Sequence, residues 1–481
     1  MSEEHKGPAL TSDSKQDLGI SESKGKAYAH TFSKKRIIKN LIIVSFAFMF
    51  LFTAFQALGA LQSSLNKEEG LGVYGLAIIY GALIVSCLFL PTPLIALLGC
   101  KWTIVVSMCC YVLYIVANFY AIWGTIAPSS VILGFGAAPL WSAKCTYLTE
   151  TAIHYGKLTG ESKDAAVNKF FGIFFAFFQT SSVWGNLISS LVFSQKRDNE
   201  TEIPEELLAK CGAAYCTGDE TIGNLTNVGL EKPPYERILM LVGIYAACGV
   251  IAIAIVIFLL DKLALESKTS EGSRKFSFDL FIATFKHMRR PEQILLIPLT
   301  MYSGFEQGFL SGDFTKSYVS CTVGIWNVGY VMICYGVVDA ICSFTFGRLV
   351  KYLGRIPFFV FGALLHFGLQ LTFLLWKPTP DHFVVYFVLA GLWGMGDAIW
   401  QTQINALYGV VFQDNTEPAF SNYRLWESLA FVLAYVFSFQ LCVNIKIYIL
   451  IGVLGLGMMG YLAVEIIQRR QGHNSGTITK D

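Results

Sequence analysis

Long apolar segments recur along the chain and are separated by shorter polar stretches. A helix needs about 20 mostly apolar residues to cross a bilayer, so each segment is a candidate span. Two segments, 293–315 and 383–405, are the weakest because each carries acidic residues, and a hydropathy count could lose one of them. The pattern predicts an all-α membrane protein with twelve transmembrane helices, at 41–61, 73–97, 102–122, 127–149, 168–193, 237–260, 293–315, 326–350, 357–376, 383–405, 424–443 and 446–467.

The composition supports lipid as the solvent for much of the chain. Of 481 residues, 54% are hydrophobic and only 15% are charged, and the mean hydropathy is +0.52. Soluble domains carry roughly 25% charged residues, so a chain of this length would lack the charge to coat them. The net charge is +2, without a basic domain, which argues against a nucleic-acid partner.

The placement of basic residues predicts the orientation. With both termini in the cytosol, 26 of the 36 Lys and Arg residues fall on the cytosolic side, and Lys144 lies inside a span. This bias supports an even number of spans. We expect a disordered cytosolic tail over 1–40, no cleaved signal peptide, and a second cytosolic tail over 468–481.

The long loop at 194–236 is then extracellular. It contains two glycosylation sequons, at Asn199 and Asn224, and both need an outer or lumenal face. Cys211 and Cys216 share this oxidising side. We predict a Cys211–Cys216 disulfide; Cys321 in the next outer loop is an alternative partner, and free thiols are a third interpretation.

An internal repeat divides the chain at a long cytosolic linker, 261–292. At an offset of 255, residues 78–99 align with 333–354 at 8 of 22 positions, including Gly99 with Gly354. Similar offsets pair helix 4 with 10 and helix 5 with 11. We predict two pseudo-symmetric six-helix halves, 41–260 and 293–467, an arrangement that resembles the major facilitator superfamily.

The loop after helix 8 resembles that superfamily's signature, G-x-x-x-D-R-x-G-R, in its glycine spacing and final arginine. Lys351 and Tyr352 replace the signature's acidic and first basic residues. In the first half only Gly99 and Lys101 remain. The signature's charged cluster helps to hold the cytosolic side closed during transport, so its loss puts ordinary alternating access in doubt.

Several stretches of the chain are distinctive, including Tyr302-Ser-Gly-Phe-Glu-Gln307, Gly391-Leu-Trp-Gly-Met-Gly-Asp397 and Phe420-Ser-Asn-Tyr-Arg-Leu-Trp-Glu427. Together, and in the expected order, they resemble the unc-93 family from about residue 38 to 468. The resemblance implies a superfamily-like fold and a role as a regulatory subunit of potassium channels. Another relative escorts nucleic-acid-sensing receptors through the secretory pathway. The resemblance supplies no catalytic or transport residues.

Polar side chains inside spans are functional candidates, since a charge there costs at least ~2.5–3.5 kcal/mol. Helices 1, 4, 7 and 10 line the central cavity in the resembled architecture, and they carry Gln56, Lys144, Glu306 and Asp397, respectively. Asp397, Gln401 and Asn405 recur every four positions and so share one helix face. The candidates for the cavity are Gln56, Trp141, Lys144, Glu306, Asp339, Asp397, Gln401, Asn405 and Glu427.

Each candidate also has a structural interpretation. We expect Lys144 near Asp397 or Glu427, either in a polar cavity or in a salt bridge that specifies packing. Glu427 pairs locally with Arg424 or braces the cytosolic ends. Asp339 either carries a coupling proton or is a hydrogen-bonded structural acid. His366 is expected to be a packed interhelical histidine.

The linker contains apolar residues at 278, 281, 282 and 285 on one helical face, followed by a basic end. This pattern predicts a helix at the inner membrane surface, although an ordinary linker between two halves would look the same.

Signatures of enzymes are absent: the sequence has no G-x-x-x-x-G-K-[ST], H-E-x-x-H, G-x-S-x-G or C-x-x-C motif. We expect no enzyme activity, no cofactor and no metal. The predicted function is regulation of a potassium channel or another membrane protein, with the plasma membrane favoured over endomembranes. The alternatives are a small-solute transporter coupled to protons through Glu306, Asp339 or Asp397, and a trafficking chaperone.

Overall fold

A computed structural model describes residues 33–161, 163–193, 203–216, 221–222, 225–263, 279–412 and 416–478. The predictions for Asn199, Asn224 and the N-terminal tail before residue 33 lie outside the described residues, as does part of the linker, 264–278.

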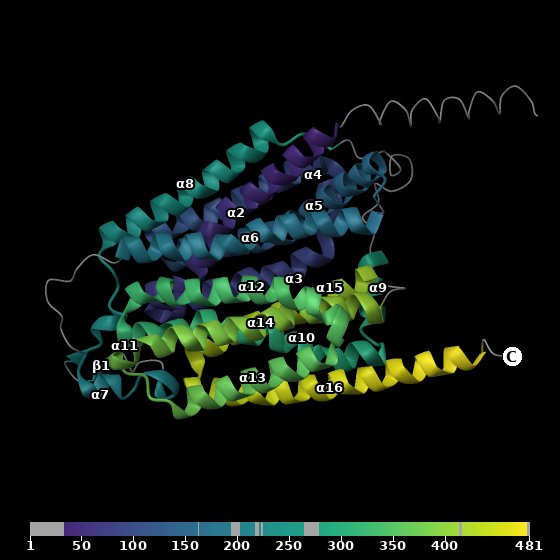
Figure 1. Ribbon diagram of the computed structural model, residues 1–481. Helices are drawn as coiled ribbons and strands as arrows, with labels where there is room; N and C mark the ends of the chain where they lie inside the picture. The colour runs from purple at the N-terminus through teal and green to yellow at the C-terminus, as the bar shows by residue number, and fades with distance from the viewer. Residues whose placement is uncertain are drawn as a thin grey trace, which may run out of the picture.

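The N-terminal half is a bundle of long helices that run side by side (Figure 1). They are α2 (Lys34–Leu65), α3 (Leu71–Phe89), α4 (Pro91–Ala117), α5 (Trp123–Thr159), α6 (Lys163–Phe193) and α8 (Tyr235–Leu259), with the 3-10 turns η1 (Glu68–Gly70) and η2 (Asn118–Tyr120). Within this half, α2 packs against α6 and α8, and α5 packs against α3 and α4. Helices that are apolar on most sides suit a lipid environment.

The C-terminal half forms the second bundle in Figure 1. α10 (Pro291–Phe309) continues without a break as a π-helix, η5 (Leu310–Ser320), and then as α11 (Cys321–Val323). The other members are α12 (Val328–Leu353), α13 (Ile356–Leu375), α14 (Phe383–Val411), α15 (Thr416–Gln440) and α16 (Val443–Ile478), with the turns η6 (Ile325–Asn327) and η7 (Pro380–His382). A short linker helix, α9 (Asp279–His287), packs on α15.

Short elements of the long loop lie at one end of the molecule, beside α11 (Figure 1). They are α7 (Glu205–Leu208), η3 (Gly212–Ala214), strands β1 (Thr221–Ile222) and β2 (Leu225–Thr226), which pair antiparallel, and η4 (Val228–Leu230). α9 lies at the opposite end.

Ten helices within the described ranges are long and apolar enough to cross a membrane. The predicted span 293–315 falls below this level, as its acidic residues suggested, whereas 383–405 meets it. The span 424–443 falls below instead, because α15 carries Arg424, Glu427 and several uncharged polar residues. Both segments are nevertheless helices packed in the C-terminal bundle. The total of twelve spans stays a prediction.

The two halves repeat one backbone feature. Gly99 (φ 70°, ψ 164°) and Gly354 (φ 74°, ψ 174°), which are 255 positions apart, share a conformation that favours glycine. Two residues after Gly99, Lys101 Nζ donates to the carbonyl oxygens of Ile257 (2.8 Å) and Leu260 (2.7 Å) at the end of α8. Directly after Gly354, Arg355 binds Glu465 of α16. Each cation therefore fastens the last helix of its own half.

The halves meet mainly where α3 packs on α15, α6 on α12, and α2 on η5. Midway, the rings of Tyr80 and Phe431 stack 4.2 Å apart. Nearer the end that carries α11, Ser64 Oγ and Ser320 Oγ lie 3.0 Å apart. At Gly329 of α12, an added Cβ would lie 2.4 Å from the Asn186 carbonyl oxygen of α6. The halves are therefore closely packed at the end of the bundle that carries α11 and the short elements of the long loop.

Candidate functional site

Three acidic residues of different C-terminal helices meet in the interior of the bundle. Glu306 is 0% exposed and Asp397 is 3% exposed. The indole Nε1 of Trp393 donates to Glu306 Oε2 at 2.6 Å, and the hydroxyl of Tyr335 donates to Asp397 Oδ2 at 2.5 Å. The two carboxyl groups also interact with each other. We call Glu306 and Asp397 the acid pair.

Asp339 of α12 completes this group. Its side chain is buried, it accepts a hydrogen bond from Ser343 Oγ at 3.2 Å, and it interacts electrostatically with Asp397. No Lys or Arg in the described part of the chain forms an ion pair with Glu306, Asp339 or Asp397. The structure therefore brings together three of the predicted candidates, without a compensating cation.

The face predicted for Asp397, Gln401 and Asn405 continues along α14. Gln401 Nε2 donates to Ser303 Oγ of α10 at 3.0 Å. Asn405 Nδ2 donates to the Gln401 carbonyl oxygen at 2.6 Å. Both side chains are half-buried, so this face runs from the acid pair along the boundary between α10 and α14.

His366 of α13 is confirmed as a packed interhelical histidine. Its Nε2 lies 3.1 Å from the Trp393 carbonyl oxygen, which can only accept, so Nε2 carries the hydrogen. Its Nδ1 accepts from Trp400 Nε1 at 3.2 Å and lies 2.8 Å from the Tyr302 hydroxyl. These bonds assign a neutral tautomer, which adds no positive charge beside the acids.

The prediction that Lys144 lies against Asp397 or Glu427 is wrong. Lys144 is 1% exposed, and its ammonium group is surrounded by aromatic rings. No carboxylate of the described residues forms an ion pair with it, and cation–π attraction to these rings takes the place of that partner. The distances from Nζ to the ring centroids are 4.7 Å for Trp141, 5.3 Å for Phe171, 4.4 Å for Phe174 and 5.2 Å for Phe175.

Trp141 and Gln56 also make their contacts within the N-terminal half. The Trp141 ring packs on Phe48, Phe52 and Phe178 in addition to Lys144. Gln56 Oε1 of α2 accepts from Ser181 Oγ of α6 at 2.9 Å. The candidates of this half therefore join α2, α5 and α6, rather than meeting the acids across the interface.

Glu427 of α15 is paired locally. Its Oε2 accepts from Arg424 Nη1 at 2.7 Å and its Oε1 accepts from the Tyr423 hydroxyl at 2.9 Å. The Glu427 side chain is 6% exposed, whereas that of Arg424 is 56% exposed. The predicted Arg424–Glu427 pair is thus confirmed, with the guanidinium on the accessible side.

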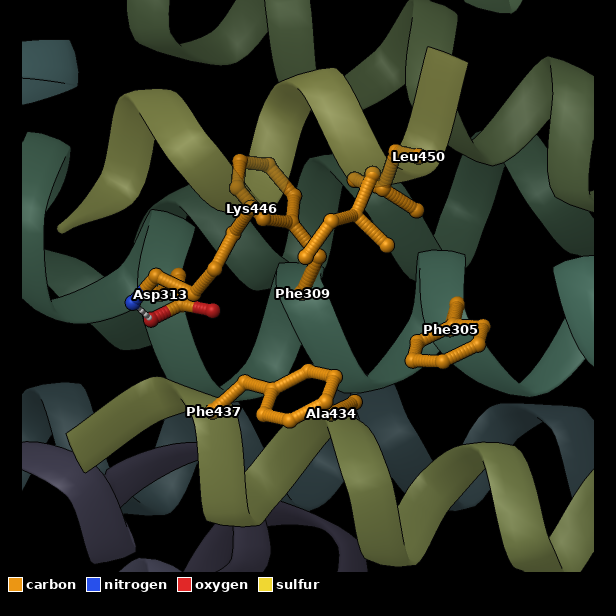
Figure 2. A pocket seen from close by; sticks show the side chains of 8 residues that line it. Phe305, Phe309, Asp313, Ala434, Phe437, Lys446 and Leu450 are labelled. Carbon is orange, nitrogen blue, oxygen red and sulfur yellow. Dashed lines mark hydrogen bonds and ion pairs between the residues drawn. The ribbon is translucent and has the colours of Figure 1, made fainter. Parts of the chain in front are cut away.

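One buried ion pair was not predicted. Lys446 Nζ of α16 lies 2.5 Å from Asp313 Oδ1 of η5, and Ser438 Oγ of α15 donates to the same oxygen at 2.8 Å. Figure 2 shows this pair beside a cavity of about 20 Å³ whose other lining residues are apolar, including Phe305, Phe309 and Phe437. Such a volume holds about one water molecule. One indication of this pair was present in the sequence, since Asp313 and Lys446 are an acid and a lysine that each lie inside a predicted span.

The predicted Cys211–Cys216 disulfide is wrong. Cys211 is bonded to Cys321, the alternative partner, and Cys216 is bonded to Cys442 between α15 and α16. Spacing in sequence could not identify Cys442, which lies 226 positions after Cys216. Both bonds join the long loop of the N-terminal half to the C-terminal half.

Further contacts seat this loop on the C-terminal half. The Val443 amide donates to the Tyr215 carbonyl oxygen at 3.0 Å, and Asn227 Nδ2 donates to the Cys321 carbonyl oxygen at 2.9 Å. At Gly229, an added Cβ would lie 2.4 Å from the Ser320 carbonyl oxygen, so only glycine fits. We call residues 203–216 and 225–230 the docked loop.

The linker helix α9 has one face buried against α15 and one exposed face. Thr284 and His287 are buried, and Asn422 Nδ2 of α15 donates to the Thr284 carbonyl oxygen at 2.9 Å. Burial lowers the pKa of His287. Ile282 and Phe285 are 59% and 45% exposed, respectively. The membrane-surface location of this exposed face stays a prediction.

The family profile described as "Ion channel regulatory protein UNC-93" matches residues 63–462. The chain belongs to the UNC-93 family. Among curated relatives in this family, protein unc-93 homolog A of Xenopus laevis is 51% identical, covering 92% of this chain and 96% of that protein. Its human counterpart is 49% identical, covering 90% and 94%. The putative potassium channel regulatory protein unc-93 of Caenorhabditis elegans is 37% identical, covering 90% and 61%.

Among solved structures, this UNC-93 family member is similar to the nucleoside transporter NupG, with a TM-score of 0.61 over 89% of this chain and 99% of that one. A mutant form of NupG gives a TM-score of 0.58, covering 89% and 98%. The sequence identities are 11% and 12%, so the likeness concerns the fold alone. It confirms the major-facilitator-like architecture of a multi-pass membrane protein.

Proposed function

We propose that this chain is a non-enzymatic accessory protein that regulates an ion channel, with a potassium channel as its partner. The observation that carries the proposal is membership of the UNC-93 family over residues 63–462, together with 37% identity to a putative potassium channel regulatory protein. The interior of the protein agrees with this role, because the buried polar side chains of each half form most of their hydrogen bonds and ion pairs within that half.

The docked loop favours a scaffold over a solute carrier. It is covalently bound to the C-terminal half at Cys321 and Cys442. Gly229 touches Ser320 of that half, whereas Tyr235, six residues later, begins α8 and donates to the Phe119 carbonyl oxygen of the N-terminal half at 2.9 Å. Six residues span at most about 20 Å, so this connection limits how far the outer ends can separate.

The cytosolic loops support the same interpretation. In the superfamily signature the loop charges hold the two halves together on the cytosolic side. Here Lys101 binds the end of α8 and Arg355 binds Glu465 of α16, so each cation stabilises its own half. We place both termini in the cytosol and the protein at the plasma membrane, where a channel partner would be regulated.

Co-expression tests the proposal. The full-length chain is expressed with individual potassium channels, starting with the two-pore class, and whole-cell current and surface density are recorded. The expected result is a reproducible change in one of them, with co-purification of that channel. An unrelated transporter of similar fold, expressed at the same level, controls for crowding of the membrane. No change with any channel and no co-purified channel would contradict the proposal.

Secondary transport is the second candidate, and the acid pair is the observation that favours it. Purified protein in liposomes would then move a small solute in response to a pH gradient. The Asp397→Asn and Glu306→Gln variants would lose that flux, whereas Asp381→Asn in the outer turn η7 would keep it. Absence of flux across a broad panel of solutes would exclude this candidate.

A further inference from the structure

Both residues of the acid pair are buried, and one of their oxygen atoms has no hydrogen-bond donor among the described residues. Glu306 Oε2 is satisfied by Trp393, but Glu306 Oε1 has no hydrogen-bond donor in the described part of the chain. Buried polar atoms are nearly always bonded, and leaving one without a partner costs about 1–3 kcal/mol. An unsatisfied oxygen of this kind, inside a packed helix bundle, points to a ligand that supplies a donor.

The neighbouring carboxyl group explains which donor is missing. The carboxyl groups of Glu306 and Asp397 interact with each other, yet two ionised carboxylates are both acceptors. They can bond to each other only when one of them holds a proton. Donors from the protein already bind the Asp397 oxygens, from Tyr335 to Oδ2 and from Gln307 to Oδ1 at 3.4 Å.

The surrounding charges do not neutralise the acid pair. From α12 comes a third acid, Asp339; from α13 comes the neutral His366; and from α10 comes the hydroxyl of Tyr302. α15 contributes Glu427, which interacts with Asp397 and is bound to Arg424. The two buried charged residues of α16 are engaged elsewhere: Lys446 binds Asp313 and Glu465 binds Arg355.

We propose that Glu306 and Asp397 form a proton-binding site in which a single proton is shared between the two carboxyl groups. A proton fits because it needs no cavity and completes the missing hydrogen bond. A metal ion does not fit, because within the described residues no three His, Cys, Asp or Glu side chains, Glu306, Asp339 and Asp397 included, are placed so that they could hold one. The corresponding span of the other half carries a buried lysine, Lys144, where this one carries Asp397.

Loss of this proton would change the packing of α10 against α14. It would leave two negative charges side by side in a buried site, and their repulsion acts between α10 and α14. The packing of these two helices therefore depends on pH. This inference goes beyond channel regulation, and it is tested on the isolated protein, so its failure would leave the proposed function intact.

Infrared spectroscopy on the purified full-length protein in lipid nanodiscs at neutral pH tests the site. A protonated carboxyl group has a carbonyl stretch that is separate from the carboxylate bands and shifts in heavy water. We expect such a band in the unmodified protein. Glu306→Gln and Asp397→Asn should each remove or shift the same band, and combining them should remove nothing more. Asp381→Asn, an exposed residue of η7, is the matched control and should leave the band unchanged.

Two results would overturn the proposal. One is a spectrum of the unmodified protein without any protonated-carboxyl band at neutral pH, which requires both acids to be ionised. The other is a pair of separate bands, one lost with each substitution, which requires two independent protons. If Glu306→Gln fails to fold, Tyr335→Phe serves in its place, because removal of its hydrogen bond to Asp397 should shift the shared band without abolishing it.

Discussion

Cys216, in the long loop of the N-terminal half, forms a disulfide with Cys442 of the C-terminal half. Cys211 crosses to Cys321 in the same way. A protease site placed in the linker between residues 264 and 278 would separate the halves as polypeptides. We expect the cleaved protein to run as one band without reductant and as two bands with it, on denaturing gels.

Single Cys211→Ser and Cys216→Ser variants should each stay linked through the remaining disulfide, and the double variant should separate without reductant. Cys109→Ser, which removes an exposed free thiol, is the matched control. Separation of the unmodified protein without reductant would instead support bonds within one half.

The aromatic surroundings of Lys144 predict tolerance of an uncharged replacement. Lys144→Met keeps the volume and removes a buried charge, so we expect the free energy of unfolding to fall by less than about 1.5 kcal/mol, or to rise. Lys144→Ala also leaves a cavity and should cost about 2–5 kcal/mol. Thermal unfolding in detergent measures both, with the exposed Lys157→Met as control. Equal losses for Met and Ala would show that the charge itself is required.

The ion pair between Asp313 and Lys446 predicts a strong coupling. Removing either partner leaves a buried charge, so Asp313→Asn and Lys446→Met should each cost about 3–5 kcal/mol. The double variant should recover most of that loss, because neither charge then remains. A double-mutant cycle of unfolding free energies measures the coupling. Additive losses would indicate that the two side chains act independently.

From the bonding of Asp261, just after α8, we predict that the stability of the fold depends on pH in the acid range. Arg36 donates to both of its oxygens, at 2.7 and 2.9 Å, and this hydrogen bonding lowers the pKa of Asp261 to about 2. A lowered pKa stabilises the fold above about pH 4, and this contribution is lost as the pH falls toward 2. The thermal midpoint of Asp261→Asn should therefore lie below that of the unmodified protein at pH 6, and the difference should vanish near pH 2.

A difference between the two proteins that is constant over this pH range would mean that Asp261 acts through its shape rather than its charge.

The two sequons predict glycans on the outer loop. Asn199→Gln and Asn224→Gln should each increase the electrophoretic mobility of protein expressed in animal cells, and the double variant should match enzymatically deglycosylated protein. Unchanged mobility in both would weaken the extracellular placement of 194–236 and, with it, the cytosolic placement of the termini.

The sequence by itself determined the parts of this protein that depend on composition and local spacing. Apolar segments of sufficient length predict helices in lipid, and the repeat at 255 positions predicted the equivalence of Gly99 and Gly354. The spacing of four placed Asp397, Gln401 and Asn405 on one face. Arg424 and Glu427 were predictable as a pair because they lie three positions apart on a helix.

Contacts between distant helices were decided only by the tertiary structure. Lys144 is stabilised by rings of α6 rather than by an acid, and Cys216 is bonded to a residue 226 positions away. The unpartnered oxygen of Glu306 also becomes visible only once Asp397 and Trp393 of α14 pack against α10. The physical reason is that hydropathy and periodicity fix which side of a helix is polar, whereas the partner of each buried charge depends on how the helices rotate and dock.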